Sequence, residues 1–368
     1  MNRYFDICAT TPIDAKVLSF LNEESKNVFG NPSSIHGFGQ KSKAIIERAR
    51  INVAKSINCI PSEIIFTSGG SISNNIALMG TLKKGDHFIT SSYEHPAILN
   101  VIPFLKKTGV SISLIKPNKD GLVEPLKIKN EINSKTKLVS IMHINNEIGT
   151  INPINEISDI TNEHGVLFHT DAVQAMGKVV IDMQKGNINL MSLSGHKFYA
   201  PKGVGILYVK DGTHIEPTLF GGGQESDLFP GTENIVNIGA IGLAAKICHE
   251  NFNSHISKIK ELDDYFIQLL NDSKIEYIIN GSNRAPGILN ISLLNSKSTA
   301  FIINLDRKGY AISAGSACAS GANKGSHTLR ELGIKSQLIE KSYRISFGKL
   351  HTKTDIKNLF ELIKKSIK

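Results

Sequence analysis

The sequence predicts an α/β protein in which a large, mostly parallel sheet is joined to a smaller α+β part near the C-terminus. Through the middle of the chain, short β-branched runs alternate with amphipathic stretches, a pattern typical of parallel strands covered by helices on both faces. From about residue 250 onward, long helical and short mixed elements replace this alternation. We therefore expect a larger domain over residues 15–249 and a smaller one over residues 250–368 together with residues 1–14.

Short runs rich in β-branched residues predict the strands of the large sheet. They cover residues 64–67, 87–90, 111–115, 138–142, 166–169 and 205–209. Amphipathic stretches at residues 40–57 and 153–163 predict two of the covering helices. Ligands bind at the carboxyl ends of the strands in such sheets, so side chains that follow a strand are the first candidates for a functional site.

The C-terminal part is predicted to be rich in helices. One helical pattern covers residues 236–270, and a closing helix is predicted to begin after Thr354, a suitable N-cap. Apolar residues of the closing helix recur at helical spacing and form one face: Ile356, Leu359, Phe360, Ile363 and Ile367.

The composition is typical of a globular protein, since 40% of the 368 residues are hydrophobic. No apolar run approaches the roughly 18 residues of a membrane span, and no signal-type apolar segment follows Arg3. We therefore expect no membrane interaction and a cytoplasmic location.

Basic residues are concentrated near the C-terminus. The net charge is +9, and residues 324–368 hold eleven Lys and Arg against four Asp and Glu. Such a region could dock an acidic protein or RNA. The charges are spread singly without interleaved aromatic residues, which favours a solvated helix face, and we expect no direct nucleic-acid binding.

The four cysteines are widely separated and lack zinc-type spacing, so no metal site is expected. Cys59 and Cys248 are expected to be small buried hydrophobes. Cys8 and Cys318 are the remaining two.

The strongest candidate site combines Asp171, at the end of a predicted strand, with Lys197, 26 residues later in a Ser-Gly-His-Lys sequence. A carboxylate at a strand end can keep a pyridinium ring protonated, and a lysine can form a Schiff base with a cofactor aldehyde. This order of elements predicts a pyridoxal-phosphate (PLP) site in which Lys197 holds the cofactor.

Two further motifs follow predicted strands. The small residues at 67–71 precede a helical pattern, where backbone N–H groups can approach a phosphate. This turn lacks the Lys of a Walker A loop and the GxGxxG pattern, so neither nucleotide-binding motif fits. His95 could stack on a planar cofactor, although a lone His is more often structural.

Two motifs in the C-terminal part concern a substrate. Apart from Cys318, residues 313–321 are all Gly, Ala or Ser. This composition indicates either an exposed loop with a nucleophilic thiol or a tight buried turn with an inert one. Arg344 lies in an otherwise apolar strand and needs an anionic partner, either a substrate carboxylate or an internal salt bridge.

Together these motifs resemble the aminotransferase class-V enzymes, and specifically the class I cysteine desulfurases of the NifS/IscS type. The resemblance covers nearly the whole chain. It rests on residues 4–6, 9–12, 30–36, 65–69, 94–95, 145–149, 169–174, 194–197 and 221–225 and on the Cys318 loop with residues 326–330. It implies a homodimer of PLP-dependent fold type I with a seven-stranded sheet. It also implies conversion of L-cysteine to L-alanine, with sulfur held on Cys318 as a persulfide for an iron–sulfur scaffold or for a sulfur carrier in tRNA thiolation.

The resemblance implies a role for each matching residue. Lys197, His95 and Cys318 would be catalytic. The cofactor would be held by Lys197, Asp171, Gln174, Asn146, His95, Gly70, Ser71, Ser194 and His196, with Thr232 reaching in from the neighbouring subunit. Arg344 and Asn31 would bind the substrate carboxylate.

The chain departs from the family pattern at a few positions. Phe229 replaces the usual Arg, Gly70-Ser71-Ile72 replaces Ala-Thr-Glu, and Cys8 lies in a segment that usually reads Asp-Asn-Ala-Ala. Ser71 keeps a hydroxyl for the phosphate, whereas Phe229 leaves reduced activity open. The alternatives are a related class-V PLP lyase, similar to selenocysteine lyase, and a catalytically weak scaffold of sulfur metabolism.

Overall fold

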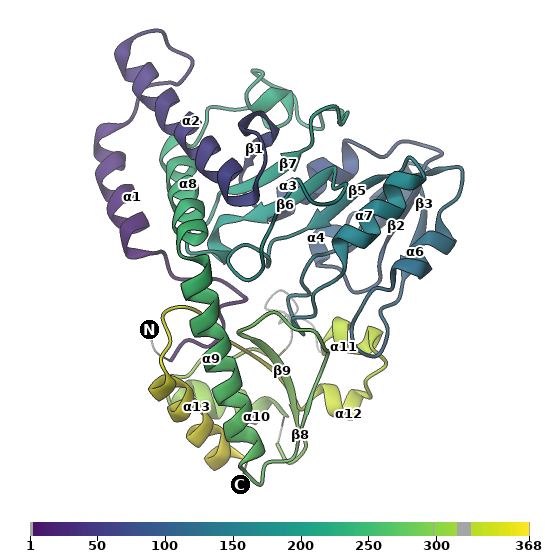
Figure 1. The fold of residues 1–368 in the computed structure, drawn as a ribbon, viewed down its shortest axis with the longest axis vertical. Coiled ribbons are helices and arrows are strands. Elements are labelled where there is room, and N and C mark those ends of the chain that lie inside the picture. Colours follow the sequence, from purple (N-terminus) through teal and green to yellow (C-terminus); the bar gives the residue numbers. More distant parts are fainter. Residues whose placement is uncertain (1–2, 297, 315–324, 368) are drawn as a thin grey trace.

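The computed structural model describes residues 3–296, 298–314 and 325–367 (Figure 1). Its large sheet consists of β1 (Ile64–Thr67), β2 (His87–Ser91), β3 (Ser111–Ile115), β4 (Thr136–Ser140), β5 (Leu167–Asp171), β6 (Leu190–Ser194) and β7 (Gly205–Val209). The strand order is β1-β7-β6-β5-β4-β2-β3. Neighbours from β6 to β3 are parallel, and β7 is antiparallel to both β6 and β1. The predicted mostly parallel sheet of seven strands is therefore confirmed.

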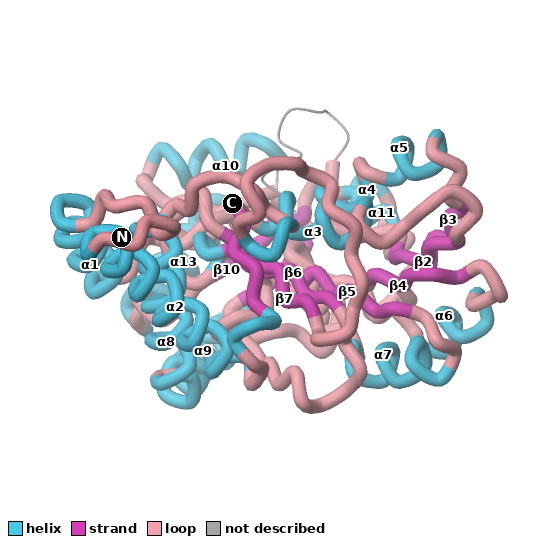
Figure 2. Tube along the Cα trace, turned by 90° about the horizontal axis from the view of Figure 1, so that it is seen from above, coloured by secondary structure: helices cyan, strands magenta, loops and turns pink. Residues whose placement is uncertain are grey.

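Helices cover both faces of this sheet. They are α1 (Ala15–Asn27), α2 (Gly37–Ile57), α3 (Gly70–Met79), α4 (Pro96–Leu99), α5 (Ile102–Lys107), α6 (Pro125–Glu131), α7 (Ile154–Glu163) and α8 (Ile235–Glu250). In Figure 2, α4 and α5 lie on one side of the strands and α6 and α7 on the other. The predicted helices at 40–57 and 153–163 correspond to α2 and α7.

A second, antiparallel sheet lies in the C-terminal part of the chain. It has the order β10-β9-β8, with β8 (Tyr277–Ile279), β9 (Ile288–Leu293) and β10 (Ser342–Ser346). The helices of this part are α9 (Phe252–Asn271), α10 (Ser298–Arg307), α11 (His327–Glu331), α12 (Ser336–Ile339) and α13 (Lys353–Ser366).

Two predicted helix boundaries were wrong. The helix expected over residues 236–270 is interrupted at Asn251, whose side chain donates back to the Ile247 carbonyl oxygen at 2.9 Å and competes with the backbone. The N-cap of the closing helix is Thr352, not Thr354. Thr352 and Asp355 exchange hydrogen bonds in a reciprocal capping box, which Thr354 cannot form because Lys357 is its third following residue.

The start of the chain passes from one sheet to the other. Tyr4 and Asp6 form bridges to Ala311 and Ser346 of the C-terminal part, and Phe5 is fully buried in the apolar core beneath the small sheet. The Thr11 backbone N–H then donates to the His196 carbonyl oxygen at 2.8 Å, at the carboxyl end of β6. Residues 4–11 therefore bring the small sheet and the large sheet together at one place.

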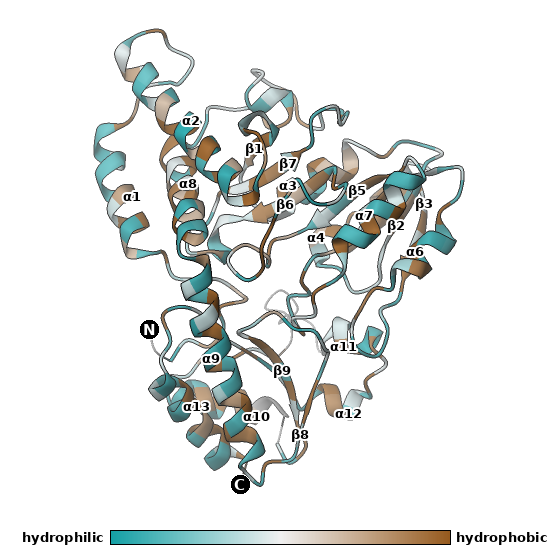
Figure 3. Ribbon diagram, in the orientation of Figure 1, coloured by the Kyte–Doolittle hydropathy of each residue, from teal (hydrophilic) through white to brown (hydrophobic). Residues whose placement is uncertain are grey.

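Apolar residues form a separate core around each sheet. Two clusters of buried side chains pack on the two faces of the large sheet, and a third includes Phe5, Phe266, Tyr343 and Phe360 beside the small one. Figure 3 shows hydrophobic residues along the strands and on the helix faces turned toward them. Among the described residues, no helix is long and apolar enough to cross a membrane.

Candidate active site

A cavity of about 470 Å³ lies at the carboxyl ends of β5 and β6, beside the first residues of α3 and α4. Its walls come from residues 8–10, from the turns that follow strands of the large sheet, and from β10. The predicted site residues that line it are Gly70, Ser71, His95, Asn146, Asp171, Gln174, Ser194, His196, Lys197 and Arg344. The cavity therefore lies where ligands bind in parallel α/β sheets.

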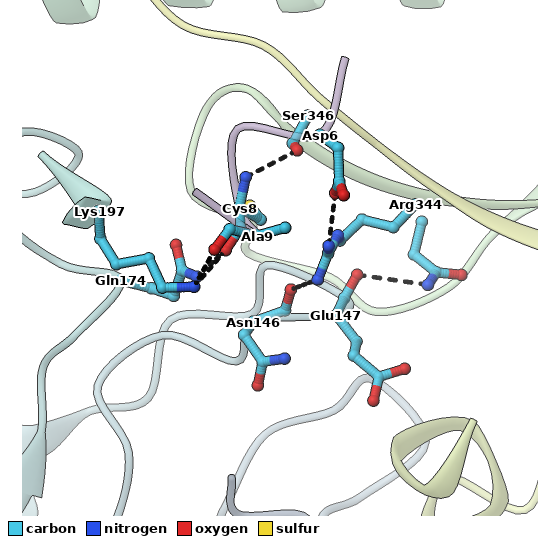
Figure 4. Close-up of polar contacts among 10 residues, drawn as sticks. Asp6, Cys8, Ala9, Asn146, Glu147, Gln174, Lys197, Arg344 and Ser346 are labelled. Atoms are coloured by element: carbon cyan, nitrogen blue, oxygen red, sulfur yellow. Dashed lines mark hydrogen bonds and ion pairs between the residues drawn. The ribbon is translucent and has the colours of Figure 1, made fainter. Parts of the chain in front are cut away.

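Lys197 is the last residue of the short 3₁₀ turn Gly195–Lys197 that follows β6. Its Nζ donates hydrogen bonds to the backbone oxygens of Cys8 at 2.6 Å and Ala9 at 2.9 Å (Figure 4). The start of the chain therefore positions the amine. Sequence reasoning missed these partners because main-chain carbonyls leave no side-chain signal.

Asp171 ends β5 and is buried. Asn74, from α3, donates to its Oδ2 at 2.7 Å, and the Val173 backbone N–H donates to its Oδ1 at 3.0 Å. Two donors from different elements thus fix the orientation of the carboxylate at the cavity wall. Asn74 was also missed, because one Asn within a helical pattern carries no signal of a carboxylate partner.

His95 is the N-cap of α4, and its Nδ1 accepts a hydrogen bond from the Ala97 backbone N–H at 3.1 Å. Burial lowers the pKa of His95, and the charge of Lys197 lowers it further, while Asp171 acts in the opposite direction. The ring is therefore neutral at neutral pH and carries its proton on Nε2. A neutral ring at the cavity wall is suited to stacking on a flat aromatic ligand.

The first turn of α3 forms a site for an anion. A Cβ atom at Gly70 would come within 2.6 Å of Val173 Cγ2, so this position has room only for Gly. The N-terminal N–H groups and the dipole of α3 favour a bound phosphate, and the Ser71 and Ser194 hydroxyls are part of the same wall. Burial, together with nearby lysines, lowers the pKa of His196 to about 4, so that its ring is also neutral.

Arg344 is a buried arginine of β10 at the opposite wall. Its Nη2 lies 2.6 Å from Asp6 Oδ1 and its Nη1 donates to the Asn146 carbonyl oxygen at 2.8 Å (Figure 4). Its Nε has no hydrogen-bond partner among the described residues. Arg344 therefore forms an internal salt bridge and also lines the cavity. Asp6 lies in a segment that carried the family resemblance, but no pattern in the sequence indicates its pairing with Arg344.

The N-terminal part of helix α11 forms hydrogen bonds with the turns beside the cavity. The Glu147 carboxylate accepts hydrogen bonds from Ser326 Oγ at 2.5 Å and Thr328 Oγ1 at 3.2 Å. His327 Nε2 lies 2.6 Å from the Ser92 carbonyl oxygen. The chain that follows the predicted Cys318 loop therefore returns directly to the site, next to Asn146 and His95.

The structure does not bring every predicted residue into this cavity. Cys318 lies outside the described residues. Asn31 lies in the connection between α1 and α2, where its Oδ1 accepts from the Ser33 backbone N–H at 2.9 Å, and Thr232 is exposed before α8. Phe229 packs partly buried against an apolar cluster and is not part of the cavity lining.

The two cysteines expected to be inert are Cys59 and Cys248. Cys248 is buried, and burial raises its pKa to about 11. Cys59 is only partly buried, which departs from the expectation, but burial still raises its pKa to about 12. Both thiols are therefore protonated at neutral pH.

The fold and the cavity together define a pyridoxal-phosphate enzyme. A strand-end carboxylate, a lysine amine and a helix N-terminus with space for a phosphate meet around one cavity, and these groups fit the ring, aldehyde and phosphate of PLP. The family model described as aminotransferase class-V matches residues 3–359. The chain belongs to this family, which confirms the resemblance seen in the sequence.

Several known proteins are similar to this chain over nearly its whole length. A cysteine desulfurase IscS of Dictyoglomus turgidum is 40% identical over 370 residues, which cover 99% of this chain and 94% of that protein. A solved NifS-like protein has a TM-score of 0.92 at 30% identity, with 99% of each chain covered. The structure of SspA in complex with cysteine has a TM-score of 0.84 at 35% identity and covers 94% of this chain and 98% of SspA.

Proposed function

We propose that this chain is a PLP-dependent cysteine desulfurase, which takes sulfur from L-cysteine and releases L-alanine. The observation that carries the proposal is a single cavity lined by Lys197, Asp171 and Arg344. The cavity occurs in a chain whose similar relatives are cysteine desulfurases, and one similar protein binds cysteine.

Residues of the large sheet hold the cofactor. Bound PLP supplies an electron sink that weakens bonds in the attached amino acid. Asp171 would keep a proton on the ring nitrogen, and the Lys197 amine would hold the aldehyde and could move a proton at the substrate. His95 stacks on the ring, while Gln174 and Asn146 bind on the side of its oxygen. The phosphate is held by Gly70, Ser71, Ser194 and His196.

Residues of the smaller part bind the substrate and take its sulfur. Arg344, together with Asn31, binds the substrate carboxylate through a planar guanidinium. The Cys318 thiolate attacks the substrate sulfur, so that an S–S bond forms and the C–S bond breaks. The carbon takes up a proton and becomes the methyl group of alanine, and Cys318 keeps a persulfide.

Two copies of the chain form the complete enzyme. Thr232 lies outside the cavity of its own chain and reaches the phosphate bound by the other copy. Three large apolar side chains are strongly exposed around the connection between α1 and α2: Phe29 (74%), Ile35 (95%) and Phe38 (61%). Their cover by a second copy removes apolar surface from water, and light scattering in solution tests for the dimer.

The remaining proposals concern organisation and destination. Residues 15–249 form the larger domain, and residues 250–368 with 1–14 form the smaller one that carries Cys318. The apolar core beside the small sheet supports this division, since it is formed by Phe5 and by residues from Ile259 onward. The protein acts in the cytoplasm, and the persulfide passes to an acceptor protein such as an iron–sulfur scaffold or a sulfur carrier.

Product analysis tests the proposed reaction. Protein reconstituted with PLP, L-cysteine and a thiol reductant is expected to form alanine and sulfide. Cys318→Ala lowers both by at least about a hundredfold, because the nucleophile is removed. Cys59→Ala, which changes a thiol outside the cavity lining, is expected to keep the original rate. Sulfide formed by Cys318→Ala at the original rate contradicts the proposal.

A further inference from the structure

Gln174 is held between two groups that differ in hydrogen-bonding character. Its Nε2 donates to the Cys8 carbonyl oxygen at 2.8 Å, and its Oε1 accepts from Lys178 Nζ at 3.2 Å. Lys178 lies four residues further along the chain. Because Gln174 lines the cofactor cavity, the direction of its amide decides which atom a ligand meets there.

Lys178 and the Cys8 carbonyl group both favour the same direction of the Gln174 amide. A lysine amine only donates hydrogen bonds, and a backbone carbonyl only accepts them. If the amide were reversed, Oε1 would face the Cys8 oxygen and the NH₂ group would face the Lys178 ammonium, so both hydrogen bonds would be lost. Lys178 is the member of this pair that can be changed by substitution, since the other is main chain.

The environment of Lys178 does not otherwise account for a lysine. Among the described residues, no carboxylate forms a salt bridge with it, and Gln174 Oε1 is the one hydrogen-bond acceptor recorded for its amine. The side chain lines a small cavity of about 30 Å³ behind Lys197. Titratable groups facing that cavity are Lys197, Tyr199, Cys248, His255 and Lys349. Burial lowers the pKa of Lys178, whereas Cys8 and Cys248 act in the opposite direction. A partly buried amine with one recorded acceptor makes that acceptor, Gln174 Oε1, its main interaction.

We propose that Lys178 is a positioning residue that fixes the Gln174 amide with its N–H groups toward the cofactor cavity. The site then offers a hydrogen-bond donor, and no amide oxygen, to an anionic ring oxygen of the ligand. This inference rests on the proposed function, because PLP is the ligand whose ring oxygen Gln174 would meet. It assigns Lys178 no contact with the reacting atoms.

The test compares donor-free and donor-bearing variants of the full-length protein. Lys178→Met and Lys178→Leu leave Gln174 Oε1 without a donor, so that only the Cys8 carbonyl oxygen still favours the observed direction of the amide and the reversed direction becomes more populated. Lys178→Arg keeps N–H donors, and the adjacent small cavity gives the guanidinium space. Lys185→Met removes a lysine from an exposed position and is the matched control.

Two properties of the bound cofactor are measured for each variant. The dissociation constant of PLP follows from its visible absorbance, and the pH at which that absorbance changes reports the charge on the ring oxygen. Both donor-free variants are expected to bind PLP about fivefold more weakly, as for the loss of one neutral hydrogen bond. Because a donor that stabilises the anionic oxygen is lost, their absorbance midpoint moves up by about one pH unit. Lys178→Arg and Lys185→Met remain close to the unmodified protein.

The melting temperature of the PLP-free protein separates positioning from packing. A purely structural Lys178 would lower this temperature on substitution and leave the absorbance midpoint unmoved, which overturns the inference. Equal effects of Arg and Met at position 178, or no effect of Met and Leu, also overturn it. If the unmodified protein binds no PLP, the proposed function itself fails, a result distinct from all of these.

Discussion

The buried guanidinium of Arg344 has two roles. It forms an ion pair with Asp6 within the protein, and it lies at the wall of the proposed substrate cavity. A buried charge that loses its partner is strongly destabilising, so Asp6 compensates the buried charge of Arg344 when no substrate is present. The fork geometry also leaves Nε as an additional donor, since this atom has no partner among the described residues.

The shape of the guanidinium therefore matters as well as its charge. Arg344→Lys keeps the charge but loses the planar fork. We expect the KM for L-cysteine to rise about tenfold, which corresponds to the loss of roughly one charge-assisted hydrogen bond, with the PLP affinity unchanged. Steady-state kinetics and PLP titration check this, with the exposed Arg307→Lys as control. A larger change in PLP affinity than in KM would place Arg344 at the cofactor instead.

Buried neutral histidines give a second prediction, on acid stability. Burial lowers the pKa of His143 to about 4, from the ordinary histidine value of about 6.5. Below about pH 6.5 the unfolded chain binds a proton at this position that the folded protein does not. The free energy of unfolding therefore decreases as the pH is lowered, until the pKa of the folded state is reached.

Removal of this group should flatten that dependence. When the pH falls from about 7 to about 5, the free energy of unfolding of His143→Leu should decrease by about 2 kcal/mol less than that of the unmodified protein. Urea unfolding at both pH values measures the difference. His249→Leu, at an exposed position, is the matched control. If His143→Leu keeps the pH dependence of the unmodified protein, His143 is not its cause.

Individual site residues could be predicted from the sequence, but their partners could not. Lys197, Asp171, His95 and Arg344 carry chemistry that depends on residue type and on their position after or within a strand. Neither residue type nor position in the sequence indicates the roles of the Cys8 and Ala9 carbonyls or of Asn74. Their roles follow from packing between segments far apart in the chain, which a single sequence does not encode locally.

Helix ends show the same contrast between pattern and partner. The apolar face of α13 was predicted correctly, because helical spacing is visible in the sequence. Its first residue was not, because Thr352 and Thr354 are both plausible caps and only the reciprocal pairing with Asp355 decides between them. The break at Asn251 likewise depends on a side chain that competes for backbone groups.

The two threonines can be distinguished by substitution. Thr352→Ala is expected to lower the free energy of unfolding by about 1 kcal/mol, because the N-cap hydrogen bond to Asp355 is lost. Thr354→Ala changes it little, since that side chain is exposed within the first turn. Chemical denaturation of both variants checks this, and an equal loss in the two variants would contradict the observed cap.

Over the whole molecule, the site exists because three distant parts of the chain meet. The large sheet contributes Asp171 and Lys197, the small sheet contributes Arg344, and residues 4–11 pass between them. The mostly parallel sheet, the second sheet and the family were predictable because alternation and motif order extend along the chain. The crossing of the N-terminal segment was not, since it depends on how the two cores pack.

The central claim is that Lys197 carries the cofactor, and chemical trapping tests it most directly. Protein incubated with PLP and reduced with borohydride is digested, and the modified lysine is located by mass spectrometry. The phosphopyridoxyl group is expected on Lys197, and Lys197→Ala is expected to carry none. Modification of a different lysine in the unmodified protein, or no modification at saturating PLP, would contradict the account.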